Sequence, residues 1–248
     1  MSSVEPKVIF EDSEILVLDK PAGMIVNRSD TTAGEKTLQG WIEEKFSIFN
    51  FQFSIDRESD FYKRAGIVHR LDKETSGILL VAKTLDAFTN LQAQFKERKV
   101  QKTYVGLAHG KIEPEEGEID VAVGRLPWNR KRFGVLSGGR ESVTQYHVLS
   151  IMYYVSGGRK KALTLVELYP KSGRTHQIRV HLQYIHHPIF ADPLYGGRKT
   201  SRNDRKLLSR VFLHAAKISF MHPKTNKLLF FESPLPDDLK DFLEGLKS

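Results

Sequence analysis

The chain of 248 residues contains no cysteine. Disulfide frameworks, thiol nucleophiles, cysteine-based zinc sites and iron–sulfur clusters are therefore excluded. No apolar run is long enough to cross a membrane, and the start MSSVEPKVIF lacks the charged and then apolar pattern of a signal peptide. We therefore expect a soluble, cytoplasmic protein that has no membrane partner.

Cationic residues outnumber acidic ones, with 38 Lys and Arg against 30 Asp and Glu, which gives a formal net charge of +8. This balance favours a polyanionic partner, because each phosphate that a protein neutralises releases counterions. The length allows one large domain or two closely associated halves, either of which buries a substantial core. No internal repeat or low-complexity segment is present.

The hydropathy pattern predicts many strands and few helices. Residues 7–20 are expected to form a β-hairpin, and helices are expected around 38–46 and 86–99. Residues 47–65 carry little periodicity and are interpreted as a loop or insertion. The pattern further predicts strands at 78–83, 103–108, 118–123, 142–155, 161–169, 211–220 and 227–232, a turn at 157–158 and a final helical stripe at Leu239, Phe242, Leu243 and Leu246. Strands broken by few helices indicate an α+β fold with a largely antiparallel sheet.

The segment VHRLDKETSGILLVAKT (68–84) is the most informative part of the chain. Residues 78–82 are short, apolar and β-branched, as expected for a buried strand. Asp72 stands just before them among small, polar and cationic residues, which is typical of a loop that binds a ligand beside a rigid element. Opposite charges favour the ionised form of a carboxylate. The alternative is that Asp72 binds turn amides or pairs with Arg70 at the surface.

Several segments resemble the RluA family of pseudouridine synthases. HRLDKETSG (69–77) is similar to the signature loop of that family, whose Asp is catalytic. The remaining similar segments follow in the family's order: QKTYVGLAHG (101–110), VGRLPWNRKRFGV (123–135), SGRTHQIRVHL (172–182), HPIFADPLYG (187–196), and LHAAKISFMHP (213–223) with ESPLPDDL (232–239).

The resemblance implies a mixed, bent, largely antiparallel sheet with flanking helices and an active cleft across its middle. It also implies a single catalytic domain over residues 1–248, without the accessory RNA-binding module that larger members carry. The expected activity is the conversion of uridine to pseudouridine in structured ribosomal or transfer RNA. We expect no cofactor or metal, because the product contains the same atoms as the substrate, and we expect a monomer.

Three residues are expected to be catalytic by resemblance. Asp72 would attack the nucleoside or remove a ribose C2′ proton, and the sequence does not choose between these roles. Arg174 would pair with this carboxylate, since a guanidinium can bind both oxygens. Tyr104 would stack on the base, although an aromatic residue in a strand pattern also suits a core.

Further residues are expected to bind the RNA. Arg70 would fill the space of an extruded uridine or contact a phosphate. His69 is expected to support the loop by a hydrogen bond, and together with Thr75 it completes the substrate-binding set of the signature loop. Arg125, Arg130, Lys131 and Arg132, interleaved with Trp128 and Phe133, predict either a phosphate-binding and stacking strip or a solvated basic hairpin.

Three other functions compete with this interpretation. A metal site could use the neighbouring His176, His181, His186 and His187, but no carboxylate completes a ligand set at helical spacing, and we expect them to be structural or to contact RNA. A glycosidase would need two cooperating carboxylates, for which only Glu74 lies near Asp72. The third possibility is a catalytically silent RNA-binding protein on the same fold.

Overall fold

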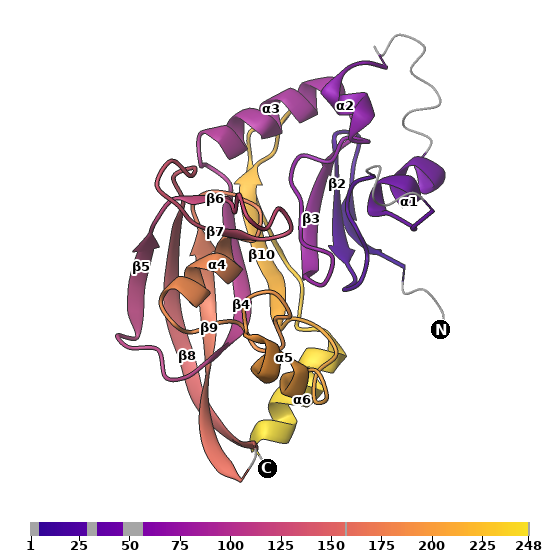
Figure 1. Cartoon of the computed structure of the whole chain (residues 1–248). Coiled ribbons are helices and arrows are strands. Elements are labelled where there is room, and N and C mark those ends of the chain that lie inside the picture. Colours follow the sequence, from indigo (N-terminus) through magenta and orange to yellow (C-terminus); the bar gives the residue numbers. More distant parts are fainter. Residues whose placement is uncertain (1–4, 29–33, 47–56, 157, 248) are drawn as a thin grey trace. The chain divides into compact units, whose positions relative to one another are not determined.

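The computed structural model describes residues 5–28, 34–46, 57–156 and 158–247 (Figure 1). The chain divides into two compact units, the first comprising residues 1–101 and 217–233 and the second residues 102–216 and 234–248. The expectation of a single catalytic domain over the whole chain stays a prediction. Among the described residues, no helix combines the length and the apolar content that a membrane span requires.

Within its described residues, the first unit is a sheet with three helices. Its strands lie side by side in the order β1 (Lys7–Glu11), β2 (Ile15–Lys20), β3 (Ser76–Ala82), the latter half of β10 (Leu213–Met221) and β11 (Leu228–Glu232). The pairs β1–β2, β2–β3 and β10–β11 are antiparallel. The helices are α1 (Leu38–Lys45), α2 (Asp60–Lys63) and α3 (Leu85–Lys96).

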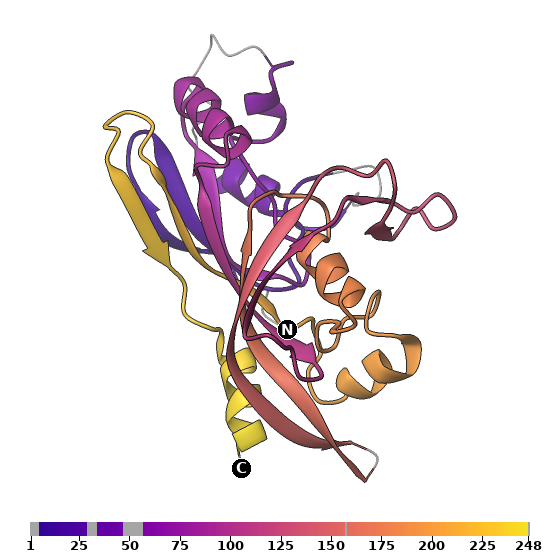
Figure 2. The ribbon, with the colours of Figure 1, turned by 90° about the vertical axis from the view of Figure 1, so that its left-hand side faces the viewer.

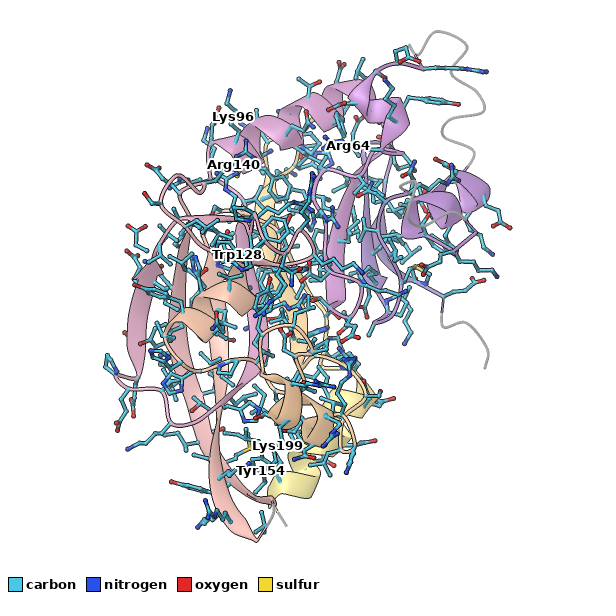
Figure 3. The ribbon with its side chains drawn as sticks, in the orientation of Figure 1. Arg64, Lys96, Trp128, Arg140, Tyr154 and Lys199 are labelled. Carbon is cyan, nitrogen blue, oxygen red and sulfur yellow. The ribbon has the colours of Figure 1, made fainter. Side chains whose placement is uncertain are left out.

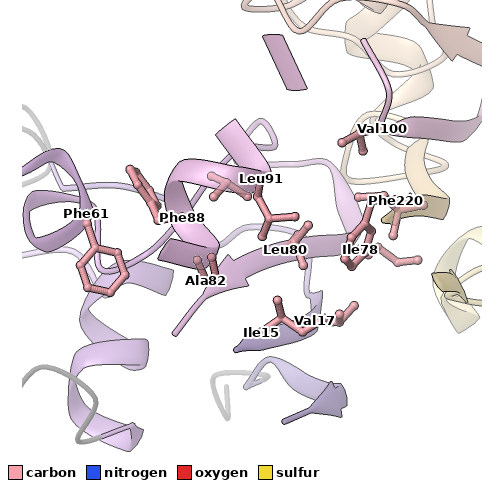
Figure 4. Packing of buried hydrophobic residues seen from close by; sticks show 13 residues of the cluster. Ile15, Val17, Phe61, Ile78, Leu80, Ala82, Phe88, Leu91, Val100 and Phe220 are labelled. Atoms are coloured by element: carbon pink, nitrogen blue, oxygen red, sulfur yellow. The ribbon is translucent and has the colours of Figure 1, made fainter. Parts of the chain in front are cut away.

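Helix α3 covers one face of β2 and β3. Thr84 caps the helix by accepting a hydrogen bond from the backbone N–H of Ala87 at 3.2 Å, and Asp86 and Lys96 complement the helix dipole at its two ends. The buried face of α3 carries Phe88 and Leu91, which pack on alternate residues of the two strands, as a period of two requires (Figure 4). The cluster also contains Ile15, Val17, Ile78, Leu80, Ala82, Phe61, Val100, Ile218 and Phe220. It supports the strand that follows the signature loop.

The second unit is built on a long hairpin. Strands β8 (Val143–Ser156) and β9 (Arg159–Pro170) pair along almost their whole length, with a bulge between Val148 and Ser150. The sheet runs in the order β10 (its first residues), β4 (Gln101–His109), β9, β8 and β5 (Glu116–Asp120), and a separate ribbon pairs β6 (Val123–Arg125) with β7 (Phe133–Val135). The helices are α4 (Gln177–Tyr184), α5 (Arg198–Asp204) and α6 (Asp237–Lys247).

The elements of the second unit cover its sheet on both sides. Figure 2 shows α4, α5 and the β6–β7 ribbon on one side of β8 and β9, and α6 on the other. Helix α4 contacts β7, β8 and β9, and α6 contacts β8. The predicted α+β class with a largely antiparallel sheet is confirmed.

Two predicted elements differ from the structure. The strand expected at 118–123 ends at Asp120, because Val121 and Val123 donate backbone hydrogen bonds to the carbonyls of Ser142 and Arg140 and the chain turns into the β6–β7 ribbon. The loop expected at 47–65 contains α2, which Ser59 caps by accepting from the N–H of Tyr62 at 3.3 Å. Residues 47–56 of that loop, and Gly157 of the predicted turn, lie outside the described residues.

Candidate functional site

The signature loop belongs to the first unit. Leu71, which is 4% exposed, anchors it in the core, and the half-buried Asp72 follows at the surface. The carbonyl of Asp72 accepts a hydrogen bond from the N–H of Thr75 at 3.1 Å, which closes a tight turn. Thr75 is 3% exposed, so the structure places it where it supports the turn. Arg70 is exposed and accessible to a large ligand.

A second segment, Lys20–Gly23, holds this turn from the side. The carbonyl of Lys73 accepts hydrogen bonds from the N–H of Gly23 at 2.8 Å and from Nζ of Lys20 at 3.2 Å. Lys20 is fully buried, and its ammonium also donates to the carbonyls of Pro21 and Met24 at 2.8 and 3.0 Å. Gly23 has φ of +86°, a conformation that favours glycine. The backbone next to Asp72 is therefore fixed by a buried cation that sequence reasoning did not assign to the site.

His69 supports the loop as expected. Its Nε2 accepts a hydrogen bond from the N–H of Leu80 in β3 at 2.9 Å, and its ring lies 5.0 Å from that of Phe95 in α3. The ring is thus engaged by both elements that carry the core. A contact between His69 and RNA stays a prediction.

In the second unit, the loop before α4 carries Arg174. Its N–H donates to Oε1 of Gln177 at 3.0 Å, and its Nε donates to the carbonyl of Glu141 at 3.4 Å. The same Gln177 oxygen accepts from the hydroxyl of Ser172 at 2.7 Å, while its amide nitrogen donates to Thr144 Oγ1 and to the Val143 carbonyl, each at 3.0 Å. Gln177, which is 4% exposed, therefore ties the Arg174 loop to the start of β8. Sequence reasoning missed it, although it lies in the segment SGRTHQ.

Tyr104 lies in β4 opposite Leu168 of β9 and is 9% exposed. Two residues earlier in the same strand, Lys102 donates from Nζ to the carbonyl of Ser172 at 3.4 Å. Because alternate residues of a strand share a face, Tyr104 lies on the face of β4 that meets the Arg174 loop. Burial lowers the pKa of Lys102 to about 8.

The predicted basic strip is a hairpin formed by β6 and β7. Arg125 donates to the carbonyl of Arg130 at 2.6 Å and lies over the ring of Phe133 at 5.0 Å. Trp128, labelled in Figure 3, is 76% exposed near the tip of the hairpin. Arg125, Arg130 and Lys131 are also exposed, whereas Arg132 is half-buried. Cations and a solvent-facing indole thus occur together on one projecting element.

Tyr195 connects this hairpin to the Arg174 loop. Its hydroxyl accepts a hydrogen bond from the N–H of Phe133 at 3.1 Å and lies 2.9 Å from Nδ1 of His176. Burial raises the pKa of Tyr195, so the hydroxyl stays protonated and can donate a hydrogen bond to Nδ1 of His176. The guanidinium of Arg132 lies over the Tyr195 ring at 5.3 Å.

A buried ion pair between Arg179 and Asp192 fixes the backbone of Tyr195. Arg179 of α4 donates to both carboxylate oxygens of Asp192 at 2.7 and 2.9 Å, and Asp192 also accepts from the N–H groups of Leu194 and Tyr195. The exposed fractions of the two side chains are 7% and 0%. A buried pair of this kind needs additional hydrogen bonds to offset desolvation, and Asp192 has them.

Three of the four neighbouring histidines bind different partners. His176 binds Tyr195, His181 lies 3.2 Å from the carbonyl of Val121, and His187 lies 2.8 Å from the carbonyl of His109. Burial lowers the pKa of His181, which favours its neutral form. In the part of the chain that the structure describes, no three His, Asp or Glu side chains are grouped to hold a metal.

The comparison with known proteins decides the family. Residues 14–184 match the family described as RNA pseudouridylate synthase. The chain belongs to this family. The match includes the signature loop, Tyr104 and Arg174, and it agrees with the RluA-type resemblance of the sequence.

Individual relatives support the assignment of the chain to this family. The chain is 36% identical over 245 residues to the ribosomal large subunit pseudouridine synthase D of Nitrosomonas europaea, covering 98% of this chain and 65% of the relative. It is 35% identical to an uncharacterized RNA pseudouridine synthase of Bacillus subtilis, YlyB, covering 97% of this chain and 72% of that protein. The chain therefore spans about two thirds of the length of the curated relatives that it matches.

A solved structure agrees as well. Human RNA pseudouridylate synthase domain containing 1 superposes with a TM-score of 0.68 at 26% identity, covering 98% of this chain and 95% of that chain. The two proteins thus share a fold.

Proposed function

We propose that this protein converts uridine to pseudouridine in structured RNA, with ribosomal or transfer RNA as substrate. The observation that carries the proposal is the family match over residues 14–184, which contains all three expected catalytic residues. A relative named for the large ribosomal subunit supports ribosomal RNA as the substrate class.

The reaction is an isomerisation. The bond from uracil N1 to ribose C1′ breaks, the base turns, and a bond from C5 to C1′ forms. C5 then loses a proton and N1 gains one, so atoms and electrons balance without a redox cofactor or an activated donor. The protein must supply a carboxylate that engages the nucleoside, a cation that keeps it ionised, and a surface that retains the detached base.

Asp72 is the proposed carboxylate. It acts on the nucleoside as a nucleophile at C1′ or as a base at C2′. The two hydrogen bonds to the Lys73 carbonyl support this role, because a fixed backbone positions a reacting group with little motion. Arg70, exposed two residues before it, is proposed to replace the extruded uridine or to bind a phosphate.

Arg174 and Tyr104 are the proposed partners of the reaction. Arg174 keeps the carboxylate ionised. The side chains of Ser172 and Gln177 and the carbonyl of Glu141 fix its loop, which supports this role. Tyr104 stacks on the free base, which is worth about 1–3 kcal/mol per base. The β6–β7 hairpin binds RNA, with Arg125, Arg130, Lys131 and Arg132 contacting phosphates and Trp128 stacking on an unpaired base.

The decisive experiment substitutes the proposed carboxylate. Asp72→Asn should lower pseudouridine formation by about 10²–10⁴-fold or more, because the amide can neither attack nor accept the proton. RNA affinity should remain within about twofold, since phosphate contacts dominate binding. The product is detected as alkali-resistant carbodiimide adducts of pseudouridine after incubation of an unmodified large-subunit ribosomal RNA transcript with the protein.

The controls separate the competing functions. Asp86→Asn removes an exposed carboxylate from α3 and should leave turnover unchanged. Full activity of Asp72→Asn would remove this residue from the mechanism. Binding without adducts by the wild-type protein would favour a silent RNA-binding protein, and adducts that EDTA abolishes would favour a metal-dependent enzyme.

A further inference from the structure

The net positive charge of the protein lies in one of its two units. The first unit contains as many Lys and Arg as Asp and Glu, 17 of each, whereas the second contains 21 Lys and Arg against 13 Asp and Glu. The net charge of +8 therefore belongs to the second unit. The β6–β7 hairpin accounts for part of this charge, and a second concentration of cations lies in and after α5.

Three cations form a stripe along α5, which we call the α5 stripe: Arg198, Arg202 and Lys206. They follow one another at intervals of four residues, and all three are exposed. The helical turn continues beyond α5, because the N–H groups of Arg205 and Leu208 donate to the carbonyls of Ser201 and Asp204, each at 2.9 Å. The stripe is therefore about 12 Å long.

The opposite side of this segment faces the protein interior. Ser201, Asp204 and Leu208 are 6%, 2% and 5% exposed. Asp204 is the only acidic residue between Gly197 and Arg210. Its Oδ2 lies 2.8 Å from Nε2 of His109 and accepts from the N–H of Ala191 at 3.3 Å, so its charge is directed inward and away from the stripe.

The segment after the stripe is also held in place. Arg205 donates to the carbonyl of Ser209 at 2.8 Å. Arg210 donates to both carboxylate oxygens of Asp238 in α6 at 2.6 and 2.8 Å. These contacts present the cations on a fixed surface, where a ligand need not order the backbone that carries them.

Like charges four residues apart destabilise a helix. Three cations at this spacing, with no acidic residue on the exposed side of the helix, therefore repel one another and destabilise the helix. A polyanion that follows the helix would remove this repulsion. Lys199, labelled in Figure 3, is exposed next to Arg198 and extends the charge to one side.

We propose that the α5 stripe is a second RNA-binding surface that holds the phosphate backbone outside the site of reaction. The partner rests on the proposed function, since RNA is the polyanion on which the family acts. The stripe lies on the same side of the β8–β9 sheet as α4, which follows the Arg174 loop, and the β6–β7 hairpin (Figure 2). It contains no aromatic residue on which a base could stack, and its cations contact phosphates.

The experiment neutralises the stripe and measures the salt dependence of RNA binding. The variant Arg198→Gln/Arg202→Gln/Lys206→Gln and the wild-type protein are compared on a large-subunit ribosomal RNA transcript. Affinity is measured by filter binding at KCl concentrations from about 50 to about 300 mM, a range in which counterion release changes affinity strongly. We expect the slope of log affinity against log salt to become shallower by about two to three, because each lost phosphate contact removes about 0.7–0.9. Affinity at ~0.15 M salt should fall roughly tenfold or more.

A matched control removes the same number of charges elsewhere in the second unit. Arg159→Gln/Lys160→Gln/Lys161→Gln lies at the far end of the β8–β9 hairpin on exposed residues and should leave the slope unchanged. The variant Arg198→Lys/Arg202→Lys keeps the charge and should bind as wild type does, which assigns the loss in the Gln variant to charge and not to the identity of the side chains.

Three outcomes would overturn the proposal. The first is an unchanged salt slope in the Gln variant of the α5 stripe, and the second is an equal loss of RNA affinity in the control variant. The third is that the Gln variant of the α5 stripe loses more affinity for phosphatidylserine vesicles than for RNA. Pseudouridine formation by the wild-type protein is scored separately. Its absence would contradict the proposed reaction, while the binding slopes would still test the stripe.

Discussion

At the scale of single residues, Gln177 is the side chain on which the geometry of the Arg174 loop depends. Its amide accepts from Ser172 and Arg174 and donates to Val143 and Thr144. Gln177→Leu would leave the fully buried hydroxyl of Thr144 without this partner, and one buried polar group left unpaired costs about 1–3 kcal/mol. We expect the free energy of unfolding in urea to fall by about that amount, and kcat to fall at least tenfold at temperatures where the variant is folded.

A glutamine with a single surface contact provides the comparison. Gln145 in β8 donates to Glu118 at 2.9 Å. Gln145→Leu should change stability by less than about 0.5 kcal/mol and leave kcat unchanged. If the two variants had equal kcat, Gln177 would not position the Arg174 loop.

Lys102 makes stability depend on pH. Burial lowers its pKa from 10.5 to about 8, so between these values the unfolded chain holds a proton that the folded protein has lost. The free energy of unfolding should therefore rise with pH from about 8 to 10.5, by at most about 3 kcal/mol. Because part of the side chain remains exposed to solvent, this value is an upper limit.

The variant Lys102→Met isolates this contribution. It should lack the rise that the wild-type protein shows, and below pH 8 it should be the more stable protein, as measured by urea denaturation at several pH values. Parallel stability curves for the two proteins would show that the ammonium is not penalised by burial.

At the scale of elements, the β6–β7 hairpin depends on one hydroxyl. Tyr195 joins Phe133 of the hairpin to His176 beside the Arg174 loop. Tyr195→Phe keeps the ring and removes both hydrogen bonds, at a cost of about 1–2 kcal/mol. We expect faster amide hydrogen exchange in residues 123–135 and weaker RNA binding, while exchange in β8 and β9 stays unchanged.

Tyr184→Phe is the matched control. Tyr184 ends α4 with 49% of its surface exposed, and the loss of its hydroxyl should alter neither exchange nor binding. Unchanged exchange in the hairpin of Tyr195→Phe would mean that other contacts dock it.

The elements that the sequence predicts are those with an apolar stripe or a short apolar run. Helix α3 has an apolar and a polar face, whereas β2 and β3 are short apolar runs bounded by polar residues, and each lies close to its predicted bounds. Helix α4 was missed because residues 177–182 are buried on all sides, so no stripe marks it, and because it begins after His176 in a left-handed conformation without a side-chain cap. Helix α5 was missed because its exposed side is cationic and only a few residues are buried.

Of the candidate site, the sequence predicts only the residues that lie in recognisable motifs. The signature loop and SGRTHQ carry the residues that resemble the family, whereas Lys20, Gln177 and Tyr195 act through contacts between segments far apart in the chain. Neither spacing nor residue type marks such contacts.

At the scale of the whole molecule, the two units differ in charge, and RNA binding should differ accordingly. Neutralising Lys45, Lys63 and Lys99 of the first unit, all exposed, by substitution with Gln should leave the salt slope of RNA binding within about 0.5 of the wild-type value. Loss of the same number of charges from Arg125, Arg130 and Lys131 of the hairpin should make it shallower by about two to three. Equal effects would show that the RNA responds to total charge.

Strand β10 has a consequence for synthesis. Its first residues belong to the second unit and its last residues to the first, where Ile218 and Phe220 complete the cluster formed by α3, β2 and β3. At about 5–20 residues per second, the ribosome needs roughly 7–26 s to pass from residue 101 to residue 233. During this interval the nascent amino-terminal half keeps an apolar face open, so a chaperone that shields such surfaces should engage this half first and leave only when the last strands emerge.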